Sequence, residues 1–512
     1  MAFKDMREFI NKLEEEGELL RIKEEVDWDL EIGAVSRGLL DIENKGINTP
    51  AVLFENIKGY PGGRFFTNSL SSYRRYSIAL GLPSDTGRTE LVRTFEKRFN
   101  DPIKPVTVDR SQAPCKENII LGDDIDVTKF PVPRWHEADG QRFIGTFYTS
   151  ILKDKDSEWV NWGMYRSCIH DKKTLGLNIP ARVEFKNGTL IHSKYIKENE
   201  RMPVVLAMGD CPTLPIVAAG MFPVGCSEVD IAGGLRQAPY ELVKAETCDL
   251  MVPANAEIII EGYIDPHDAI PEGPFGEYTG YYGGEEMPRP VIRVTCITHR
   301  NDPILIGSQE GVPFVDDHYM CSISMSAMAR HHLISTLKLP GVKDVFFHPA
   351  ADWNFCVVSA DKIYDGAANT IAFALWSSKL GCQSGYADWV VVVDDDVDPS
   401  DINQVLWVLV TRCNPAESVH IVRNKGGVNL LNPTMHIDDR NKMLSAGGIC
   451  IDAGWPYSWK AEEMKTGRKV IPTVSNWEDW PDEVRERAEY LAASANPIPV
   501  RLGGVILQAS EL

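Results

Sequence analysis

The hydrophobic positions of the first hundred or so residues alternate between helical and extended patterns. Met6, Phe9 and Leu13 recur at three- and four-residue spacing, which predicts an amphipathic helix at the start of the chain. The other elements expected here are a strand over residues 18–26, a helix over 32–42, a strand over 51–54 and a helix over 89–99. Together they predict a small α/β unit that occupies residues 1–115.

Short runs of β-branched and aromatic residues, separated by turns, dominate the middle of the chain. Strands are expected over residues 145–152, 160–169, 175–179, 204–208, 257–263 and 291–298, and one inserted helix over 238–247. Many strands with few helices are typical of a barrel or split barrel. We assign this domain to residues 116–310.

Strand–helix alternation returns after residue 310. The elements expected are helices over 325–337, 366–380 and 402–411 and strands over 342–347, 355–359, 389–393 and 419–422. The strand over 389–393 is wholly apolar, which predicts a sheet covered on both faces. The sequence therefore predicts a second α/β domain over 311–455, then a tail over 456–512 with a charged helix over 481–493. The fold class expected is a multidomain α/β (α+β) protein.

The composition narrows the classes of function. A hydrophobic share of 44% and a charged share of 25% are ordinary for a globular protein. The net charge of −20 argues against nucleic acid or an anionic membrane as the main partner. None of the 11 cysteines stands in CxxC spacing, and the first residues show no signal-peptide pattern. We therefore expect a cytoplasmic protein with free thiols.

The segment PEGPFGEYTG, residues 271–280, contains two carboxylates five positions apart, Glu272 and Glu277. A regular strand would point them to opposite faces, but the intervening glycines and proline favour an irregular loop. Such a loop can turn both carboxylates toward one site, an arrangement suited to general acid–base chemistry. The alternative is a tight turn with two solvated glutamates, and the residues alone leave both open.

Asn161 and Arg166 lie in the run NWGMYR on the strand expected over 160–169. The Arg166 guanidinium can bind a carboxylate or phosphate through two parallel hydrogen bonds, and Asn161 offers a neutral oxygen to a hard metal ion. Their spacing puts them on opposite faces of a flat strand, so a bulge at Gly163 would be needed to bring them together. The alternative is a barrel strand with an arginine at its rim.

Two further acidic features, a single glutamate and a run of three aspartates, could also belong to a site. Glu241 is expected in the first turn of the helix over 238–247, where it could equally compensate the helix dipole. Asp394, Asp395 and Asp396 follow the apolar strand, where ligands of α/β sheets gather, although they could be a solvated strand end. The sequence has no HExxH, GxSxG, GxGxxG or P-loop pattern.

Taken in order, these segments resemble the UbiD family of decarboxylases, which includes ferulic acid decarboxylase and polyprenyl-hydroxybenzoate decarboxylase. The resemblance runs nearly end to end, over residues 54–61, 161–166, 240–244, 250–254, 257–262, 272–281, 394–398, 406–407 and 411–412. It implies a central split barrel similar to flavin reductases and a C-terminal α/β oligomerisation domain. It also implies prenylated FMN held with a divalent metal, Mn²⁺ or Mg²⁺, and K⁺.

The resemblance carries over to individual residues. Its metal ligands would be Asn161 and Glu241, with a third ligand that is normally a histidine in the loop corresponding to 181–187. That loop contains no histidine here, so His192 is the expected third ligand and Asn187 the alternative. The cofactor-binding residues implied are Asn161, Trp162, Met164, Tyr165, Arg166, Glu241 and Lys442, the last as the nearest match for a family lysine.

The family's acid–base network corresponds to Arg166, Glu272 and Glu277. The resemblance implies that Arg166 orients the substrate carboxylate and pairs with Glu272, while Glu277 protonates the carbon that loses CO₂. The cofactor would take up the electron pair, because an sp² carbon has nowhere else to put it. Substrate contacts are expected from residues 311–317 and 430–435.

The expected function is reversible, non-oxidative decarboxylation of an aromatic, heteroaromatic or α,β-unsaturated carboxylic acid. Expected partners are that acid, CO₂, a flavin prenyltransferase that supplies the cofactor, and further copies of the chain in a homodimer or homohexamer. Two alternatives stay open. One is a flavin reductase-like oxidoreductase that uses plain FMN and consumes NAD(P)H. The other is a non-catalytic subunit of a carboxylase complex, which would bind no flavin.

Overall fold

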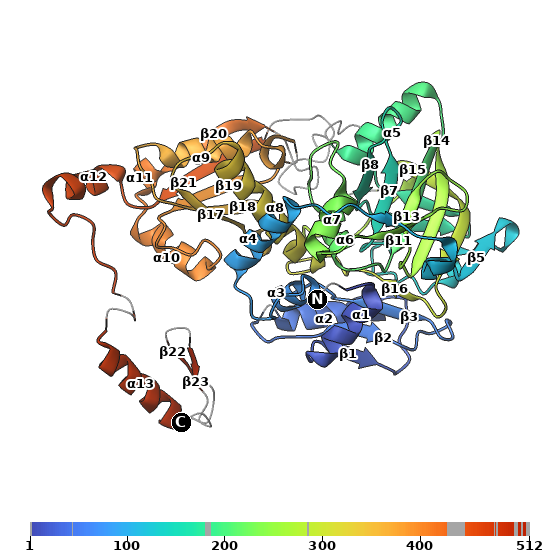
Figure 1. Cartoon of the computed structure of the whole chain (residues 1–512), viewed down its shortest axis with the longest axis horizontal. Coiled ribbons are helices and arrows are strands. Elements are labelled where there is room, and N and C mark those ends of the chain that lie inside the picture. The colour runs from blue at the N-terminus through green and yellow to red at the C-terminus, as the bar shows by residue number, and fades with distance from the viewer. Residues whose placement is uncertain are drawn as a thin grey trace. The chain divides into compact units, whose positions relative to one another are not determined.

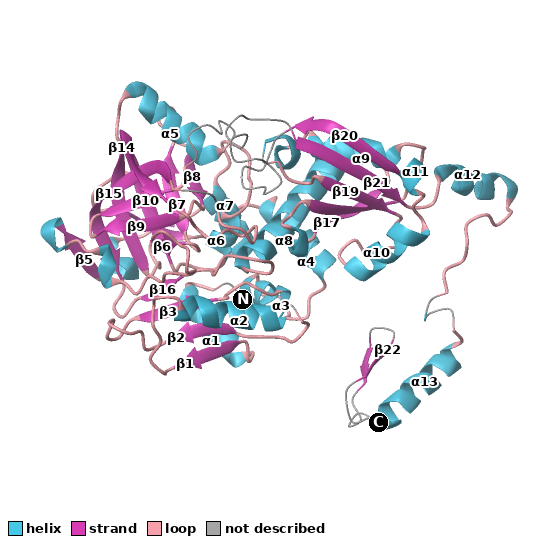
Figure 2. Cartoon of the chain, turned by 180° about the vertical axis from the view of Figure 1, so that it is seen from behind, coloured by secondary structure: helices cyan, strands magenta, loops and turns pink. Residues whose placement is uncertain are grey.

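The protein was analysed as a computed structural model. It describes residues 3–43, 45–179, 186–283, 286–383, 385–426, 446–475, 477, 480–495, 500–502 and 505–507. The chain forms two compact units, Met1–Gly454 and Trp455–Leu512. Figure 1 follows the chain through them by colour, and Figure 2 separates helices from strands.

The N-terminal part of the larger unit is a four-stranded sheet with helices. Its strands lie in the order β1 (Leu19–Ile22), β2 (Ala51–Phe54), β3 (Arg64–Thr67) and β16 (Ile304–Ile306). The helices are α1 (Met6–Glu15), α2 (Glu31–Glu43), α3 (Tyr73–Ala79) and α4 (Arg88–Phe99). The α1 helix confirms the amphipathic pattern, since Met6, Phe9 and Leu13 are all buried. Strand β16 comes from far along the chain and carries the following residues to the edge of the active-site region.

The middle part is a nine-stranded curled sheet whose recorded pairings are all antiparallel. Its path is β6 (Arg142–Gly145), β9 (Ser167–Asp171), β10 (Thr174–Leu177), β15 (Met287–His299), β14 (Ile258–Glu272), β11 (Met202–Met208), β7 (Thr149–Lys153) and β8 (Val160–Gly163), with β5 (Asn118–Leu121) paired to β15. The first and last strands of this path are not paired to each other, so the sheet forms the expected split barrel.

Helices α5 (Asn187–Glu198), α6 (Thr213–Ala218) and α7 (Glu228–Arg236) accompany the barrel. Strands β12 (Glu241–Lys244) and β13 (Met251–Pro253) follow α7 in the chain and form a small sheet with β4 (Val106–Thr107), in the order β13, β12, β4. The helix expected over 238–247 is wrong. Helix α7 ends at Arg236 and is capped by Gln237, which is left-handed with φ 62°. Residues 241–244 then pair as β12 with both β13 and β4. Sheet pairing here overrides the local pattern.

The C-terminal part of the larger unit is a five-stranded sheet flanked by helices, as Figure 2 shows. Its order is β17 (Val342–Phe347), β18 (Phe355–Ala360), β19 (Trp389–Val393), β21 (Ala446–Ala453) and β20 (Val419–Gly426). The helices are α8 (Asp316–Arg330), α9 (Ala367–Trp376), α10 (Ile402–Thr411) and α11 (Pro415–Ser418), with π-helical turns at His331–Thr336 and Lys379–Gln383. Strand β19 is central, and its four consecutive valines are buried, as its apolar run predicts.

The aspartates that follow β19 form an internal ion pair. The buried Arg412 donates from Nη1 to Asp394 Oδ2 at 3.3 Å and to Asp396 Oδ1 at 2.7 Å. The cluster thus neutralises an arginine of the domain core, and it does not line the active-site cavity described below.

The smaller unit, Trp455–Leu512, contains α12 (Tyr457–Thr466), α13 (Asp482–Ala495) and the hairpin of β22 (Val500–Leu502) and β23 (Val505–Leu507). Helix α13 confirms the helix expected over 481–493. Over the described residues, no helix is both long enough and apolar enough to cross a membrane.

Candidate active site

A cavity of about 240 Å³ lies within the larger unit, where the barrel meets α8 and the segment after α9. Five of the residues expected to bind cofactor or substrate line it: Asn161, Met164, Tyr165, Arg166 and Glu277. Asn161 and Arg166 reach the same cavity because the strand expected over 160–169 is broken. Strand β8 ends at Gly163 and β9 begins at Ser167. The chain between them leaves the sheet, and the Met164 amide donates to the Ala218 carbonyl at 3.1 Å.

Arg166 joins the two glutamates of the PEGPFGEYTG segment. Its Nε donates to Glu272 Oε1 at 2.8 Å and its Nη2 donates to Glu272 Oε2 at 3.2 Å, a bidentate pair. Its Nη1 contacts Glu277 Oε1. Glu272 is 2% exposed and Glu277 is 5% exposed, so the three charges interact out of bulk water. Arg289 Nε lies 3.7 Å from Glu272 Oε2 and supplies a second cation.

The loop holds this geometry through its own backbone. Glu272 is the last residue of β14, and Gly273 turns the chain away at φ +107°, a conformation that favours glycine. The Glu277 amide donates to the Tyr281 carbonyl at 3.0 Å, which closes the far side of the loop. A Cβ at Gly276 would lie 2.5 Å from His136 Nδ1, so the loop can pack against His136 only with glycine at this position. The irregular conformation points both glutamates at Arg166.

A second polar cluster lines the cavity at Asn161, Asn187 and Glu228. Asn161 Nδ2 donates to Glu228 Oε1 at 2.8 Å, and Asn187 Nδ2 lies 3.5 Å from the same oxygen. The Trp162 amide donates to Glu228 Oε2 at 3.1 Å, and the Tyr165 hydroxyl donates to Asn161 Oδ1 at 2.8 Å. Strand β8 and the starts of α5 and α7 thus bring their oxygen-bearing side chains together.

Lysine adds positive charge beside these oxygens. Lys379 Nζ donates to Asn187 Oδ1 at 3.2 Å and to the Phe222 carbonyl, and Lys186 also lines the cavity. Burial raises the pKa of Glu228 to about 7 and lowers the pKa of Lys379 to about 8, because each charge is partly desolvated. The carboxylate of Glu228 would therefore stabilise a bound cation, and the ammonium group of Lys379 would stabilise a bound anion.

The donor set fits a hard divalent ion next to a phosphate. Amide and carboxylate oxygens are the ligands that such ions take, and the buried carboxylate of Glu228 calls for a neighbouring positive charge. In the described part of the chain no three His, Cys, Asp or Glu side chains are grouped as metal ligands, so the fit depends on the two asparagines. Their amide oxygen and nitrogen are interchangeable by a rotation of the side chain.

Three expected residues are not part of this cluster. Glu241 lies in strand β12, accepts a hydrogen bond from Asn255 Nδ2 at 2.9 Å and pairs with Lys4 at 3.7 Å. It does not line the cavity, because the segment is a strand in a separate sheet and the expected helix does not form; Glu228 stands beside Asn161 instead. Lys442 lies outside the described residues.

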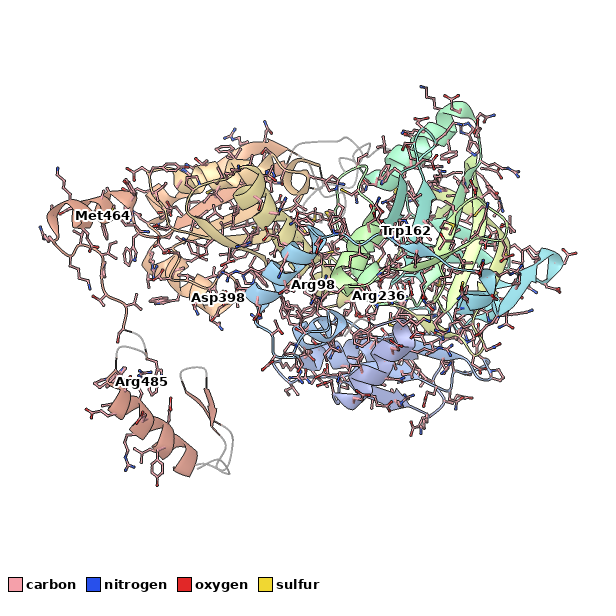
Figure 3. All side chains as sticks on the ribbon, viewed as in Figure 1. Arg98, Trp162, Arg236, Asp398, Met464 and Arg485 are labelled. Carbon is pink, nitrogen blue, oxygen red and sulfur yellow. The ribbon has the colours of Figure 1, made fainter. Side chains whose placement is uncertain are left out.

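His192 is the third. It lies five positions after Asn187 on α5, about 140° around the helix, and is absent from the cavity lining. It is buried, and its Nε2 makes no hydrogen bond to the described part of the chain. Burial lowers the pKa of His192 to about 4. Trp162, labelled in Figure 3, contributes its backbone amide to Glu228, while its side chain packs in the hydrophobic core.

Several cavity residues were not singled out from the sequence: Glu228, Lys379, Glu310, Asp317, Tyr278, Trp353 and Tyr386. Glu228 begins α7 and looks like an ordinary first-turn glutamate, and Lys379 is one charge in an apolar helical pattern. These residues become candidates only in the structure, where they line the same cavity as Asn161 and Arg166. Two of them lie within longer segments to which the sequence pointed: Tyr278 in PEGPFGEYTG, and Asp317 among the substrate contacts expected from 311–317.

Comparison with known proteins supports the same architecture. Family models of 3-octaprenyl-4-hydroxybenzoate carboxy-lyase match the chain in three parts: the N-terminal domain over residues 10–95, the Rift-related domain over 106–313 and the C-terminal domain over 318–453. A phenolic acid decarboxylase of Sedimentibacter hydroxybenzoicus is 31% identical over 495 residues, 95% of this chain and 98% of that one. A pyrrole-2-carboxylic acid decarboxylase of Pseudomonas aeruginosa is 29% identical, covering 95% and 97%.

Solved structures are similar over almost the whole length. Vanillic acid decarboxylase of Sedimentibacter hydroxybenzoicus in its open form has a TM-score of 0.82 at 30% identity, covering 97% of this chain and 100% of that one. The UbiD-class enzyme HmfF from Pelotomaculum thermopropionicum, in complex with FMN, has a TM-score of 0.77 at 28% identity, covering 93% and 99%. An evolved dimeric form of HmfF in complex with prenylated FMN has a TM-score of 0.76 at 27% identity, covering 94% and 100%.

Proposed function

The chain belongs to the UbiD family of carboxy-lyases, and from that premise we propose that it decarboxylates an aromatic, heteroaromatic or α,β-unsaturated carboxylic acid, reversibly and without net oxidation, using prenylated FMN. The observation that carries the proposal is Arg166 held between two buried glutamates in a cavity that also contains an oxygen and lysine cluster. The flavin in the two HmfF structures supports the choice of cofactor.

The cofactor and its ions fit the polar cluster. Asn161, Asn187 and Glu228 would hold Mn²⁺ or Mg²⁺, and Lys379 would balance the flavin phosphate. A phosphate brings about two negative charges, which a buried site must neutralise. K⁺ stays in the proposal as a family expectation, with no ligands assigned to it. We replace Glu241 with Glu228 and His192 with Asn187, because the former two do not line the cavity.

When bound, prenylated flavin supplies the electron sink for the pair left behind by CO₂. Arg166 binds the substrate carboxylate, and Glu272 fixes its guanidinium plane through the bidentate pair. Glu277, in contact with Arg166 Nη1, enters this step as the neutral acid. As CO₂ departs, it gives its proton to the carbon, and the carboxylate that forms faces Arg166 beside Glu272. In the reverse direction this carboxylate takes the proton back.

The surroundings protect this proton from bulk water. Phe275, 2% exposed, lies under the guanidinium of Arg166, with 5.4 Å from the Arg166 Cζ to the ring centroid. Gly283 passes so close that a Cβ there would lie 3.0 Å from Glu277 Cγ. A carboxylate and a guanidinium interact more strongly in such a dry site than in water.

The remaining expectations stand as part of the proposal. They are the domain boundaries 1–115, 116–310, 311–455 and 456–512, a cytoplasmic location, cofactor supply by a flavin prenyltransferase, and a homo-oligomer, homodimer or homohexamer. The dimeric form described for the evolved HmfF supports an oligomer.

The test is coexpression of the protein with a flavin prenyltransferase, followed by mass and absorption spectra of the copurified flavin. CO₂ release is then measured without oxygen and without NAD(P)H, over a panel of aryl, heteroaryl and acrylic acids. The proposal predicts a prenylated flavin and CO₂ release from at least one class of acid. NAD(P)H consumption with plain FMN would favour a reductase, and a protein that binds no flavin would favour a non-catalytic subunit.

A further inference from the structure

The cavity contains two carboxyl groups that the proposed mechanism does not use, Glu310 and Asp317. Glu310 follows β16 after a short connection and is 4% exposed. Both of its carboxyl oxygens are buried and make no hydrogen bond to the described part of the chain. The same holds for Asp317 Oδ1, on the second residue of α8. Two acids are thus placed in the cavity wall, and the part of the chain that the structure describes offers these oxygens no hydrogen-bond partner.

An unsatisfied carboxyl group in a buried wall is unfavourable unless something else completes its hydrogen bonds. Burial, and after it the charge of Asp317, raises the pKa of Glu310 well above its ordinary value. Burial raises the pKa of Asp317 to about 7, with a further contribution from Asp316. At neutral pH the pair is therefore at least partly protonated, and it presents both acceptor oxygens and an O–H donor.

Aromatic side chains line the same cavity as this pair. Tyr278 and Trp353 stack with ring centroids 4.6 Å apart at an interplanar angle of 29°. Tyr386 packs edge-on against Trp353 at 5.7 Å, and its hydroxyl lies 3.2 Å from that of Tyr278. Tyr278 and the proposed proton donor Glu277 both line the cavity, so a ring bound beside these aromatic side chains shares the cavity with that donor.

We propose that Glu310 and Asp317 form a subsite that binds a hydroxyl or ring N–H group of the substrate. The inference rests on the proposed function and narrows its substrate class to hydroxylated aryl acids and N–H heteroaryl acids. The acid's carboxylate lies at Arg166, its ring lies beside the aromatic side chains of the cavity, and its donor group completes the hydrogen bonds of the pair. A second carboxylate on the ring would meet like charge there, and an unsubstituted ring would leave the pair unsatisfied.

The experiment compares kcat/KM of the holoenzyme for benzoic acid, the three monohydroxybenzoic acids, pyrrole-2-carboxylic acid and terephthalic acid. We expect the best hydroxylated or N–H acid to exceed benzoic acid by at least roughly 100-fold, as in sites built to hydrogen-bond a substrate group. Glu310→Gln and Asp317→Asn should each reduce that preference by about tenfold or more, mainly by raising KM for the preferred acid. Asp365→Asn, an exposed position with the same charge change, is the control and should leave the preference intact.

Binding gives a readout that does not need turnover. The quenching of tryptophan fluorescence by phenol and by benzene in the holoenzyme measures the subsite alone, and phenol should bind more tightly to wild type than to Glu310→Gln. Equal conversion of benzoic and hydroxybenzoic acids by wild type would overturn the subsite while leaving decarboxylation intact. So would an unchanged preference in both variants. Phenol binding that depends on Glu310, in a protein that releases no CO₂ from any acid, would support the subsite and count against the proposed function.

Discussion

Arg166 uses three of its nitrogens on two carboxylates, Nε and Nη2 on Glu272 and Nη1 on Glu277. This pattern needs the planar guanidinium fork, because an ammonium group is a single point charge. Substitution at this one residue therefore separates a need for positive charge from a need for geometry.

Arg166→Lys should lower kcat/KM by at least roughly 100-fold, nearly as much as Arg166→Ala, because lysine cannot make the bidentate pair with Glu272. Steady-state CO₂ release at matched flavin occupancy measures the effect. Arg293→Lys, at a surface arginine that pairs with Asp268, is the matched control. If Arg166→Lys kept most of the activity, Arg166 would be a rim residue of the barrel.

Glu277→Gln should abolish turnover, by roughly 100- to 10,000-fold, and leave the flavin bound, because an amide cannot give or take the proton. The absorption spectrum of the purified variant shows whether flavin is retained, and CO₂ release shows the loss. Turnover close to the wild-type rate in this variant would assign the proton donor elsewhere.

At the scale of elements, the sequence predicted the helices and strands that have a strong hydrophobic periodicity. It did not predict which of these elements contact one another. The amphipathic pattern of α1 and the apolar run of β19 each correspond to an observed element. The irregular loop after β14 was foreseen because its glycines and proline exclude regular structure. The helix expected over 238–247 fails, because strand β12 is stabilised by β13 and β4, which come from other parts of the chain.

This error explains the exchange of Glu241 for Glu228. Sequence alone placed Glu241 in the first turn of a helix that does not form. The partner of Asn161 is the first residue of α7, and only the packing of α7 against β8 brings it there. Arg236, at the other end of α7 and labelled in Figure 3, donates from Nη1 to the Pro239 carbonyl at 3.3 Å and does not line the cavity.

The metal content of the holoprotein tests which elements hold the ion. Asn187→Ala and Glu228→Gln should each lower bound Mn²⁺ about tenfold or more at a fixed metal concentration, because each removes an oxygen donor. His192→Ala and Glu241→Gln should retain full occupancy, since neither side chain lines the cavity. Mass spectrometry of metal in flavin-loaded protein provides the measurement. Full occupancy in Asn187→Ala with loss in His192→Ala would return the role to the histidine.

At the scale of the whole molecule, the larger unit combines four sheets with buried carboxyl groups, and the ionisation of these groups links stability to pH. Asp210, at the end of β11, is 5% exposed, and its Oδ2 makes no hydrogen bond to the described part of the chain. Burial raises the pKa of Asp210 to about 7 from an ordinary value of 3.8. The folded state thus prefers the protonated acid.

The stability contribution of Asp210 is fully present below pH 3.8 and is lost as the pH rises toward 7, where the buried group ionises. Asp210→Asn removes this titration. The free energy of unfolding of the variant should gain on wild type by up to a few kcal/mol between pH 4 and pH 7. Urea denaturation at several pH values measures the difference, with the exposed Asp365→Asn as control. A difference that does not change with pH would contradict a raised pKa at this position.

The overall layout of the larger unit was within reach of the sequence, because runs of strands and alternating strands and helices leave distinct patterns. The pairing of strands that lie far apart in the sequence could not be predicted in this way. Strand β16, residues 304–306, completes the N-terminal sheet beside β3, although hundreds of residues separate the two. That pairing places Glu310 in the cavity wall, and no local sequence pattern predicts this position.

The central claim is reversible, non-oxidative decarboxylation, and isotope exchange tests it most directly. Holoprotein is incubated with a hydroxybenzoic acid and ¹³C-bicarbonate, without oxygen and without NAD(P)H, and the carboxyl group of the recovered acid is examined by mass spectrometry. The account predicts that ¹³C enters the carboxyl group with wild type, and that Glu277→Gln and flavin-free protein give none. Absence of exchange from flavin-loaded wild type, over hydroxylated, N–H heteroaryl and acrylic acids alike, would contradict it.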